Sequence, residues 1–600
     1  MIREEARAHQ TAIEDVHRYH DGTKHAFEGF ARSLGYLDWA SQPRPFRAFA
    51  NAPVFPLFPE PSVAAKLPAA DYSPRATTYT ELFDHQGPAE SLHAAALGDV
   101  LRHALGLAAW KRFGTSRWSL RANPSSGNLH PTETYIVCGA MSGLADAPAV
   151  YHYAADRHAL ERRCVFDERV WSVEGGASVV LVALTSIHWR EAWKYGERAF
   201  RYCQHDLGHA IGAISVAAAL VGWRAMLLPS WSHAAIAALT GIDRDEDFAD
   251  AEREEPGCIM ALWTPQDQTP VIGTDRLVEA VGSGRWSGQA SQLSEDHVEW
   301  TFIDEIARAT ETQGIPNPPC QRDTVGAVRE PPLQRRPFPS HGVTPAHDHL
   351  VVGSVTDVSR PLGTCSGDRQ LDARSLILQR RSAVAFDGRS SIGRTAFFEM
   401  LRRVMPGSHA PWNALWWTPR IHLAIFVHRV EDLAPGLYLL ARDPQAVDRL
   451  REACGREFLW EVAHDALPFF RLAQGACRAL AARLSCDQAI AADGFFSLGM
   501  IADFDASLDA YGASFYRNLF WESGVVGQTL YLEAEAAGAR ATGIGCFYDN
   551  PVHDTLGLQG HAFQSLYHFT VGIPVEDRRI TTDPGYEWEM PGSHEGLEQF

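Results

Sequence analysis

The sequence has no long hydrophobic run and no excess of basic residues. Its longest apolar stretch, residues 211–221, is too short to cross a bilayer, which argues against a membrane-spanning protein. Lys and Arg number 54 against 73 Asp and Glu, and the net charge of −19 argues against nonspecific binding to nucleic acid. The first five residues do not begin an apolar core of the kind found in signal peptides. We therefore expect a cytoplasmic protein that binds neither nucleic acid nor membranes.

Cysteine is also sparse. The ten cysteines in 600 residues form no Cys-x-x-Cys pair and no Cys/His cluster with zinc spacing. This pattern indicates reduced, mostly buried thiols, and we expect no metal site. The apolar content of 46% and the charged content of 21% are typical of a globular protein, at a length that suggests several domains.

What the sequence does contain is an internal repeat. Its register holds over seven residues with no insertion or deletion between them, at an offset of 316 positions. A period of this length indicates two tandem globular domains, because solenoid repeats span only about 20–50 residues. The residues Tyr195, Gly196, Arg201, Gly208, Gly222, Arg224 and Gly241 recur as Tyr511, Gly512, Arg517, Gly524, Gly538, Arg540 and Gly557.

The composition along the chain predicts the domain boundaries. We assign residues 1–265 to a first copy with an N-terminal arm, and residues 371–600 to a second copy. Residues 266–370 between them are crowded with Pro, Gly, Ser and charge, which is typical of a linker. One helical piece is expected in this linker, near residues 298–310.

Each copy mixes helix and strand signals. Residues 206–221 are small and apolar on nearly all faces, which predicts a buried central helix, and residues 522–537 are its counterpart. Gly222 and Gly538 follow these helices, where a C-terminal glycine belongs. An α+β fold with an antiparallel-dominated sheet flanked by helices fits these signals. Strands are expected at residues 134–138, 179–184, 421–427 and 567–571.

Two glycine-containing motifs suit a planar ligand. In residues 121–131 (Arg-Ala-Asn-Pro-Ser-Ser-Gly-Asn-Leu-His-Pro), Pro124 and Gly127 force an irregular loop with hydroxyl, amide and backbone N–H groups. Gly543 and Gly545 flank one isoleucine, so that the backbone there can lie flat against a ring system. An ordinary turn and a buried strand of small residues are the alternatives.

Two charged motifs suit an anion and a proton transfer. Arg380, Arg381 and Ser382 combine guanidinium groups with a hydroxyl, which matches a phosphate. Lys194 and Tyr195 offer a cation and a phenol that handle a proton once burial shifts the pKa of either group. A solvated arginine pair and an amphipathic segment that leads into the central helix are the corresponding alternatives.

Together these motifs resemble the FMN-dependent nitroreductase superfamily, and within it the SagB-type dehydrogenases and the azoline oxidases that form thiazoles and oxazoles. The resemblance covers both copies. Its most specific parts are the loop at residues 123–131 and the Arg380–Ser382 motif. The segments 19–25 and 35–39 are similar to the opening of the tandem members.

The resemblance implies a dimer-like fold with FMN at the interface, formed here within one chain as a pseudo-dimer that is a monomer or pairs further. It implies catalytic roles for Lys194 and Tyr195. The phosphate would bind to Arg380, Arg381 and Ser382, with Arg578 or Arg579 as the C-terminal basic partner. The ring would lie between Gly543, Ile544 and Gly545 on one side and the loop on the other, with Gln488 at its edge. The loop residues implied in cofactor binding are Arg121, Pro124, Ser125, Ser126, Gly127 and Asn128.

The two copies lose complementary parts of this site. Lys194 corresponds to Ala510, and Gly543 to Gly545 correspond to Leu227-Leu228-Pro229. The first copy keeps the loop and the Lys-Tyr pair, and the second keeps the arginine motif and the glycines. Because these parts come from opposite subunits of a symmetric dimer, we expect one composite FMN site.

The expected function is an FMN-dependent dehydrogenase or oxidase of azoline type, which acts on a modified peptide or a small heterocycle. One alternative is an NAD(P)H-dependent reductase of nitroaromatics or quinones. A second is an idle scaffold that docks partner enzymes of a biosynthetic complex.

Overall fold

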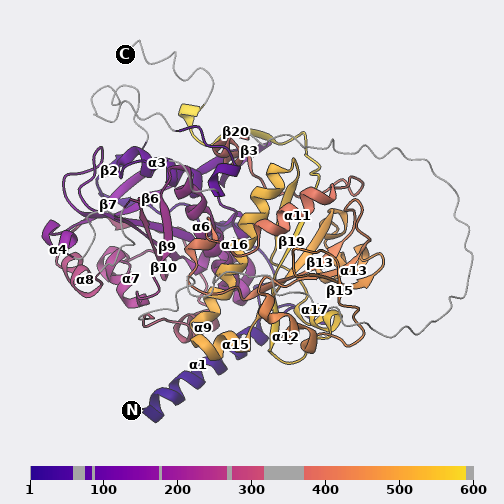
Figure 1. Ribbon diagram of the computed structural model, residues 1–600. Coiled ribbons are helices and arrows are strands. Elements are labelled where there is room, and N and C mark those ends of the chain that lie inside the picture. The colour runs from indigo at the N-terminus through magenta and orange to yellow at the C-terminus, as the bar shows by residue number, and fades with distance from the viewer. Residues whose placement is uncertain are drawn as a thin grey trace, which may run out of the picture.

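Two antiparallel sheets flank a central pair of long helices (Figure 1). The computed structural model describes residues 2–57, 75–83, 88–173, 179–266, 273–315 and 371–589. The first sheet has the order β11-β7-β6-β5-β8-β10-β9, with β2 also paired to β7. Its strands are β2 (Val54–Pro56), β5 (Thr132–Cys138), β6 (Ala149–Ala154), β7 (Ala159–Val165), β8 (Val179–Ser186), β9 (Arg224–Leu227), β10 (Glu255–Trp263) and β11 (Arg285–Trp286).

The second sheet repeats this plan with the order β15-β16-β14-β13-β17-β19-β18. In both sheets the named strands pair antiparallel, as predicted. The four strands expected from the sequence are parts of β5, β8, β13 and β19. The second sheet comprises β13 (Ile421–Val427), β14 (Gly436–Leu440), β15 (Glu461–Val462), β16 (Phe469–Gln474), β17 (Phe496–Asp503), β18 (Arg540–Ile544) and β19 (Phe563–Gly572).

The helices follow the same duplication. The central helices α6 (Ala199–Leu220) and α16 (Phe515–Ala536) begin and end 316 residues apart, as do α7 (His233–Thr240) and α17 (Asp549–Leu556). Gly241 and Gly557 end the latter pair with the same φ of +72°. The tandem duplication is therefore confirmed. The remaining α-helices are α1 (Ile2–Gly22), α3 (Ala94–Ala104), α4 (Glu168–Val173), α5 (His188–Tyr195), α8 (Asp275–Gly282), α9 (Thr301–Ala309), α10 (Ala373–Gln379), α11 (Arg394–Arg403), α12 (Val447–Ala453), α13 (Arg478–Leu484), α14 (Ile490–Asp493) and α15 (Asp505–Tyr511).

The two central helices cross at a pair of glycines. A Cβ atom on Gly208 would overlap the carbonyl oxygen of Trp521, and a Cβ atom on Gly524 would overlap the carbonyl oxygen of His205. Because these two contacts are related by the repeat register, a pseudo-twofold axis passes between the glycines. Only glycine allows two helix backbones to approach so closely.

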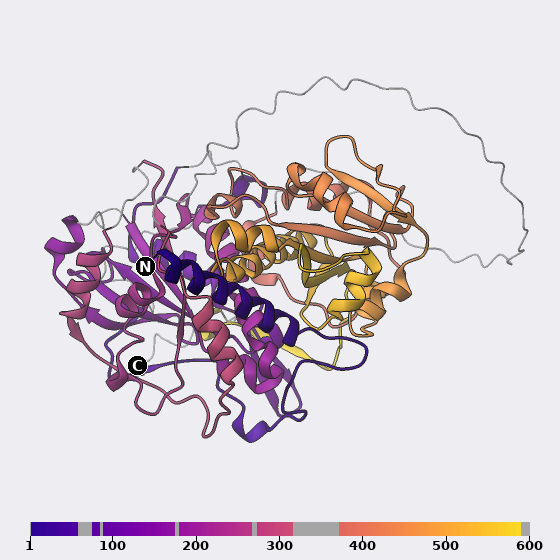
Figure 2. The same ribbon diagram turned by 90° about the horizontal axis from the view of Figure 1, so that it is seen from below.

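Each central helix also carries an arginine that binds the end of an N-terminal helix. Arg201 of α6 donates to Thr23 Oγ1 and to the carbonyl of His20 at the end of α1. Arg517 of α16 donates to Thr310 Oγ1 and to the carbonyl of Ala307 at the end of α9. The helices α1 and α9 pack together on the underside of the molecule (Figure 2).

One of these two helices, α9, lies in the predicted linker. The helix α9 falls within residues 266–370, at the helical piece expected there, and it makes for the second copy the contacts that α1 makes for the first. The sequence analysis did not predict α1. Residues 316–370 of the predicted linker lie outside the described residues.

The C-terminal end of the chain crosses to the first copy. The strand β20 (Thr581–Pro584) pairs with β3 (Leu107–Phe113), which in turn pairs with β4 (Ser116–Arg121). This small sheet brings the second copy beside the loop that follows β4.

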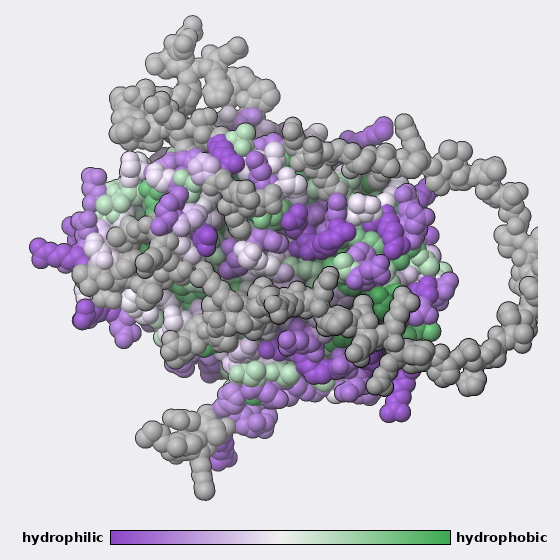
Figure 3. Space-filling view, viewed as in Figure 1, coloured by the Kyte–Doolittle hydropathy of each residue, from purple (hydrophilic) through white to green (hydrophobic). Residues whose placement is uncertain are grey.

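The face seen in Figure 3 is largely hydrophilic, with separate smaller apolar areas. Among the described helices, none combines the length and the apolarity that a membrane crossing requires.

The glycine crossing generates a stability prediction. We expect Gly208→Ala and Gly524→Ala each to lower the free energy of unfolding by about 1–3 kcal/mol, because the added methyl group forces the helix backbones apart. Thermal unfolding measures the effect. The matched control is Gly282→Ala, where an added Cβ meets no atom within 4 Å. A melting temperature of either crossing variant equal to that of the control would contradict the close approach.

Candidate functional site

The loop between β4 and β5 meets the end of α5. Gly127 in this loop has φ +58°, a left-handed conformation that favours glycine. A Cβ atom here would lie 2.7 Å from the Tyr195 hydroxyl and 3.3 Å from Lys194 Nζ. The two predicted catalytic residues therefore lie side by side against the predicted loop. Lys194 is exposed, and Tyr195 is partly buried.

A buried carboxylate of the central helix holds the loop in place. Asp206 accepts hydrogen bonds from the backbone N–H of Ser126 at 3.0 Å and from its hydroxyl at 3.0 Å. The loop is further fixed by Ser125, whose hydroxyl oxygen accepts from His130 N, and by Asn128, whose amide donates to Ser119 O. Burial raises the pKa of Asp206 to about 7, although the hydrogen bonds from Ser125 and Ser126 act to lower it.

A second buried acid, Glu191, lies on the same helix as Lys194 and Tyr195, α5. Glu191 is fully buried, and neither of its carboxylate oxygens has a hydrogen-bond partner among the described residues. Burial raises the pKa of Glu191 well above its usual value, and the charge of Asp206 adds to this shift. Burial also raises the pKa of Tyr195, with further contributions from Glu191 and Asp206. The Tyr195 phenol is therefore protonated at neutral pH.

The sequence analysis missed Asp206 and Glu191. A signal for each was present: Asp206 is a charge inside an apolar helix, and Glu191 lies three residues before Lys194 on the same helix.

The glycine motif, Gly543 to Gly545, lies at the end of β18 in the second copy. A Cβ atom on Gly543 would overlap the Tyr567 hydroxyl, and one on Gly545 would overlap the ring of Tyr202. Tyr202 belongs to the first copy, and its hydroxyl donates to the carbonyl of Gly545 at 3.1 Å. Ile544, between the two glycines, is buried. The side-chain amide of Gln488 donates to the carbonyl of Cys546, directly after Gly545, at 3.0 Å.

The arginine motif joins the two copies. Arg380, 4% exposed, donates from Nε to Ala122 O at 3.0 Å and from Nη2 to Arg121 O at 3.1 Å, while its Nη1 is buried without a partner among the described residues. Arg381 donates to Ala108 O at 3.1 Å in β3. The Ser382 hydroxyl lies 2.9 Å from the hydroxyl of Tyr531, which also accepts from Gly543 N. The motif thus touches both the first copy and the glycine strand.

Further cations gather at this end of the site. Burial, followed by the charges of Arg380 and Arg540, lowers the pKa of Arg381 to about 10. Burial and the charge of Arg381 likewise lower the pKa of Lys111 in β3. The sequence analysis missed Lys111 and Arg540, although Arg540 is one of the repeat anchors.

Three of the predicted basic residues are engaged elsewhere or exposed. The guanidinium of Arg121 donates to Pro45 O at 2.7 Å, so only its backbone carbonyl meets Arg380. Arg578 and Arg579 are both exposed. Arg579 pairs with Asp577 at 2.6 Å and lies over the ring of Phe113. The interactions described for these two residues do not connect them with Arg380.

The pseudo-symmetric counterpart of this site is filled. Leu227, Leu228 and Pro229 stand where the second copy has its glycines, and Trp521 stands where the first copy has His205. The cavity between them measures about 50 Å³, whereas small-molecule sites enclose roughly 300 Å³ or more. It is also lined by Trp416 and by Asn518, the counterpart of Tyr202. Large side chains therefore take up most of the space at this position, which also lacks the glycines.

The loop anchor is nevertheless duplicated. Glu522 corresponds to Asp206 and accepts from the backbone N–H groups of Arg420 at 3.0 Å and Ile421 at 3.2 Å. Both copies therefore use an acid of the central helix to hold a loop, but only the first copy presents the Pro-Ser loop.

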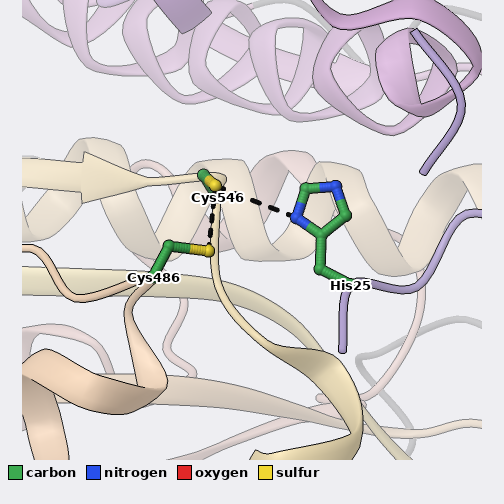
Figure 4. A group of neighbouring side chains, drawn as sticks. All are labelled: His25, Cys486 and Cys546. Atoms are coloured by element: carbon green, nitrogen blue, oxygen red, sulfur yellow. Dashed lines mark hydrogen bonds between the residues drawn. The ribbon is translucent and has the colours of Figure 1, made fainter. Parts of the chain in front are cut away.

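One group of metal-ligating side chains also lies together in the described part of the chain. His25, Cys486 and Cys546 offer ligand atoms within 4.8 Å of one another (Figure 4). The sequence analysis expected no such cluster because its members come from three distant segments.

Comparison with known proteins gives a family. The model described as "Nitroreductase family" matches residues 89–261 and 436–573, together more than half of the chain. A protein from Anabaena variabilis ATCC 29413 that is named as a nitroreductase has a similar fold, with a TM-score of 0.63 and 20% identity. The match covers 94% of this chain and 99% of that chain.

Two further structures match over parts of this chain. A chain of the Escherichia coli microcin synthetase McbBCD complex is 16% identical over 33% of this chain and 73% of that chain, with a TM-score of 0.24. A protein from Ralstonia eutropha JMP134, also named as a nitroreductase, is 13% identical over 38% of this chain and 97% of that chain, with a TM-score of 0.25. No curated protein matches this chain.

The buried loop anchor makes stability depend on pH. Burial raises the pKa of Asp206 from 3.8 to about 7, so the folded protein keeps a proton that the unfolded chain releases in this range. Stability therefore falls as the pH rises from about 4 to 7, by at most about 1.4 kcal/mol per pH unit from this group. We expect Asp206→Asn, which keeps an oxygen for Ser126, to weaken this dependence.

Melting temperatures at pH 4.5 and pH 7 measure the difference. The control is Asp577→Asn, at a partly exposed carboxylate whose pKa Arg579 lowers to about 2, so that it does not titrate in this window. Equal pH slopes in Asp206→Asn and the wild type would show that Asp206 does not titrate between pH 4 and 7.

Proposed function

The chain belongs to the nitroreductase family of flavin-dependent oxidoreductases, and from this premise we propose that it is an FMN-dependent dehydrogenase with one composite flavin site. Its substrate would be an azoline ring in a modified peptide or a small heterocycle. The observation that carries the proposal is the convergence of Lys194 and Tyr195 on Gly127, beside Tyr202, whose hydroxyl donates to the glycine strand of the other copy.

The residues fit an FMN phosphate at the basic end. The buried Nη1 of Arg380 has no partner among the described residues, and an anion would satisfy it. Arg381, Arg540 and Lys111 crowd together. Burial and the charges of neighbouring arginines lower the pKa of Arg381 and of Lys111, and a phosphate would relieve this repulsion. We propose that Arg380, Arg381 and Ser382 hold the phosphate, with Arg540 and Lys111 in the place that the sequence analysis gave to Arg578 or Arg579.

The residues also fit a planar ring. Because Gly543 and Gly545 carry no side chains, the Tyr567 hydroxyl and the Tyr202 ring pack directly against the strand, and we propose that these groups border the planar ring. On the opposite face, residues 124–128 are held by Asp206, and Gly127 keeps the loop open toward Tyr195. Gln488 would support the ring edge indirectly, through its hydrogen bond to Cys546 O. Bound FMN would supply the two-electron acceptor for the oxidation.

The chain itself would handle the proton. Because burial keeps the phenol of Tyr195 protonated, we assign it the role of a hydrogen-bond donor that orients the substrate. We assign Lys194 the role of the base that accepts the proton from the substrate carbon. The charges of Glu191 and Asp206 add to the raised pKa of the Tyr195 phenol. A reductase of flat acceptors has no need for such a base, which favours the dehydrogenase over the alternative.

The test compares variants across the repeat. We expect Lys194→Ala to bind FMN as the wild type does but to oxidise a thiazoline-containing peptide at least about 100-fold more slowly, since general bases contribute about 10²–10⁴-fold. The product is detected by mass spectrometry as the loss of two hydrogen atoms. Tyr195→Phe should also slow the reaction, whereas the matched control Tyr511→Phe, at the counterpart in the second copy, should not.

Oxidation by Lys194→Ala at the wild-type rate would contradict the assigned base. Rapid bleaching of the flavin by NAD(P)H, without azoline oxidation by the wild type, would favour the reductase. A colourless protein that cannot be reconstituted with FMN would instead support the scaffold.

A further inference from the structure

Two cysteines lie in contact at the end of the glycine strand. Cys486 follows α13 and Cys546 follows β18, and a hydrogen bond joins their two sulfur atoms, which lie 2.9 Å apart (Figure 4). Both residues are partly exposed, whereas the other described cysteines are all buried. The other described thiols are therefore shielded, and this pair is open to reagents in solution.

The surroundings of Cys546 favour a thiolate. The contact with Cys486, followed by the hydrogen bond with His25, lowers the pKa of Cys546. His25 Nδ1 lies 3.8 Å from the Cys546 sulfur, and the positive charge of Arg198 acts in the same direction. The contact between the two sulfurs raises the pKa of Cys486, which remains a thiol. The pair thus consists of an activated sulfur beside a protonated one.

The geometry fits a sulfur–sulfur reaction better than a shared metal. Two thiolates bound to one zinc ion at about 2.3 Å each, in tetrahedral geometry, stand about 3.8 Å apart. The two sulfurs here are closer than that, at 2.9 Å. The nearby guanidinium of Arg198 also disfavours a divalent cation, while it stabilises a thiolate.

We propose that Cys486 and Cys546 form a redox-active dithiol–disulfide pair whose oxidant is a low-molecular-weight disulfide such as glutathione disulfide. The Cys546 thiolate attacks one sulfur of the oxidant, so that a mixed disulfide forms and one thiolate leaves. Cys486 then attacks the Cys546 sulfur of the mixed disulfide, and its proton passes to the thiolate that departs in this step, which leaves as a thiol. The thiolate released in the first step takes its proton from water. One protein disulfide forms, and one small disulfide is reduced to two thiols.

The pair is connected to the glycine strand. Cys546 directly follows Gly545, and its carbonyl accepts from Gln488. Arg198 donates to the carbonyl of Gly545 at 3.3 Å and pairs with Asp549 at 2.9 Å. Other titratable groups whose charges act on the pair are Tyr195, Tyr202 and Tyr548. Oxidation of the pair would therefore affect the conformation of the glycine strand. The thiol chemistry itself does not depend on the proposed flavin reaction.

The experiment is a redox titration of the full-length protein in mixtures of reduced and oxidised glutathione. After acid quenching and alkylation, peptide mapping by mass spectrometry should show one linked pair, Cys486 with Cys546, formed in a single two-electron transition. Mapping also separates this pair from Cys320 and Cys365, which lie outside the described residues. The control Cys454→Ser removes a buried thiol and should leave the transition unchanged.

Single variants assign the two roles. In Cys486→Ser we expect Cys546 to accumulate one glutathione as a mixed disulfide, because the resolving thiol is gone. In Cys546→Ser we expect Cys486 to remain a free thiol over the same time. His25→Gln should raise the midpoint pH for alkylation of Cys546.

Three results would overturn the proposal. The first is the absence of the linked pair in the folded wild type at every glutathione ratio. The second is equal glutathionylation of the two single variants, which would remove the distinction between attacking and resolving sulfur. The third is an equimolar zinc content in the purified wild type that Cys546→Ser loses, which would make the cluster a metal site.

Discussion

The close crossing of α6 and α16 at Gly208 and Gly524 is the constraint on which the rest of the structure depends. Because neither glycine carries a Cβ atom, the two helix backbones meet at a pseudo-twofold axis, and the two sheets take fixed positions on either side. Two residues that serve the candidate site belong to α6: Asp206 holds the loop of the first copy, and Tyr202 contacts the glycine strand of the second. A shift of the crossing would separate the loop from the strand that faces it.

The two copies differ at the residues that line the two pseudo-symmetric positions beside the helix crossing, so these positions are not equivalent. On one side of the axis, Gly543 and Gly545 face tyrosines, and cations from both copies crowd together. On the other side, Leu228, Pro229 and Trp521 fill the corresponding space. Duplication thus preserved the scaffold, including the pairs Asp206/Glu522 and Arg201/Arg517, and divided the ligand-facing residues between two sites, of which one is filled.

The sequence predicted those parts of this arrangement that local patterns and the repeat register encode. The central helices, the antiparallel strands and the duplication are confirmed, because small apolar residues, β-branched runs and a constant offset are visible without any tertiary contact. The contributions of Lys111 and Arg540 were missed, since they depend on β20 bringing the second copy to β3 and on the folding of distant segments together. The contact between Cys486 and Cys546 was missed for the same reason: the two residues lie sixty positions apart and follow different elements, α13 and β18.

The measurement that tests the central claim most directly is an equilibrium titration of the apoprotein with FMN. One composite site predicts one FMN per chain, and it predicts that Arg380→Gln weakens binding by about 10–150-fold, the equivalent of a charged hydrogen bond of about 1.5–3 kcal/mol. The control Arg579→Gln, at an exposed residue paired with Asp577, should bind as the wild type does. Two FMN molecules per chain, or unchanged affinity in Arg380→Gln, would contradict the account.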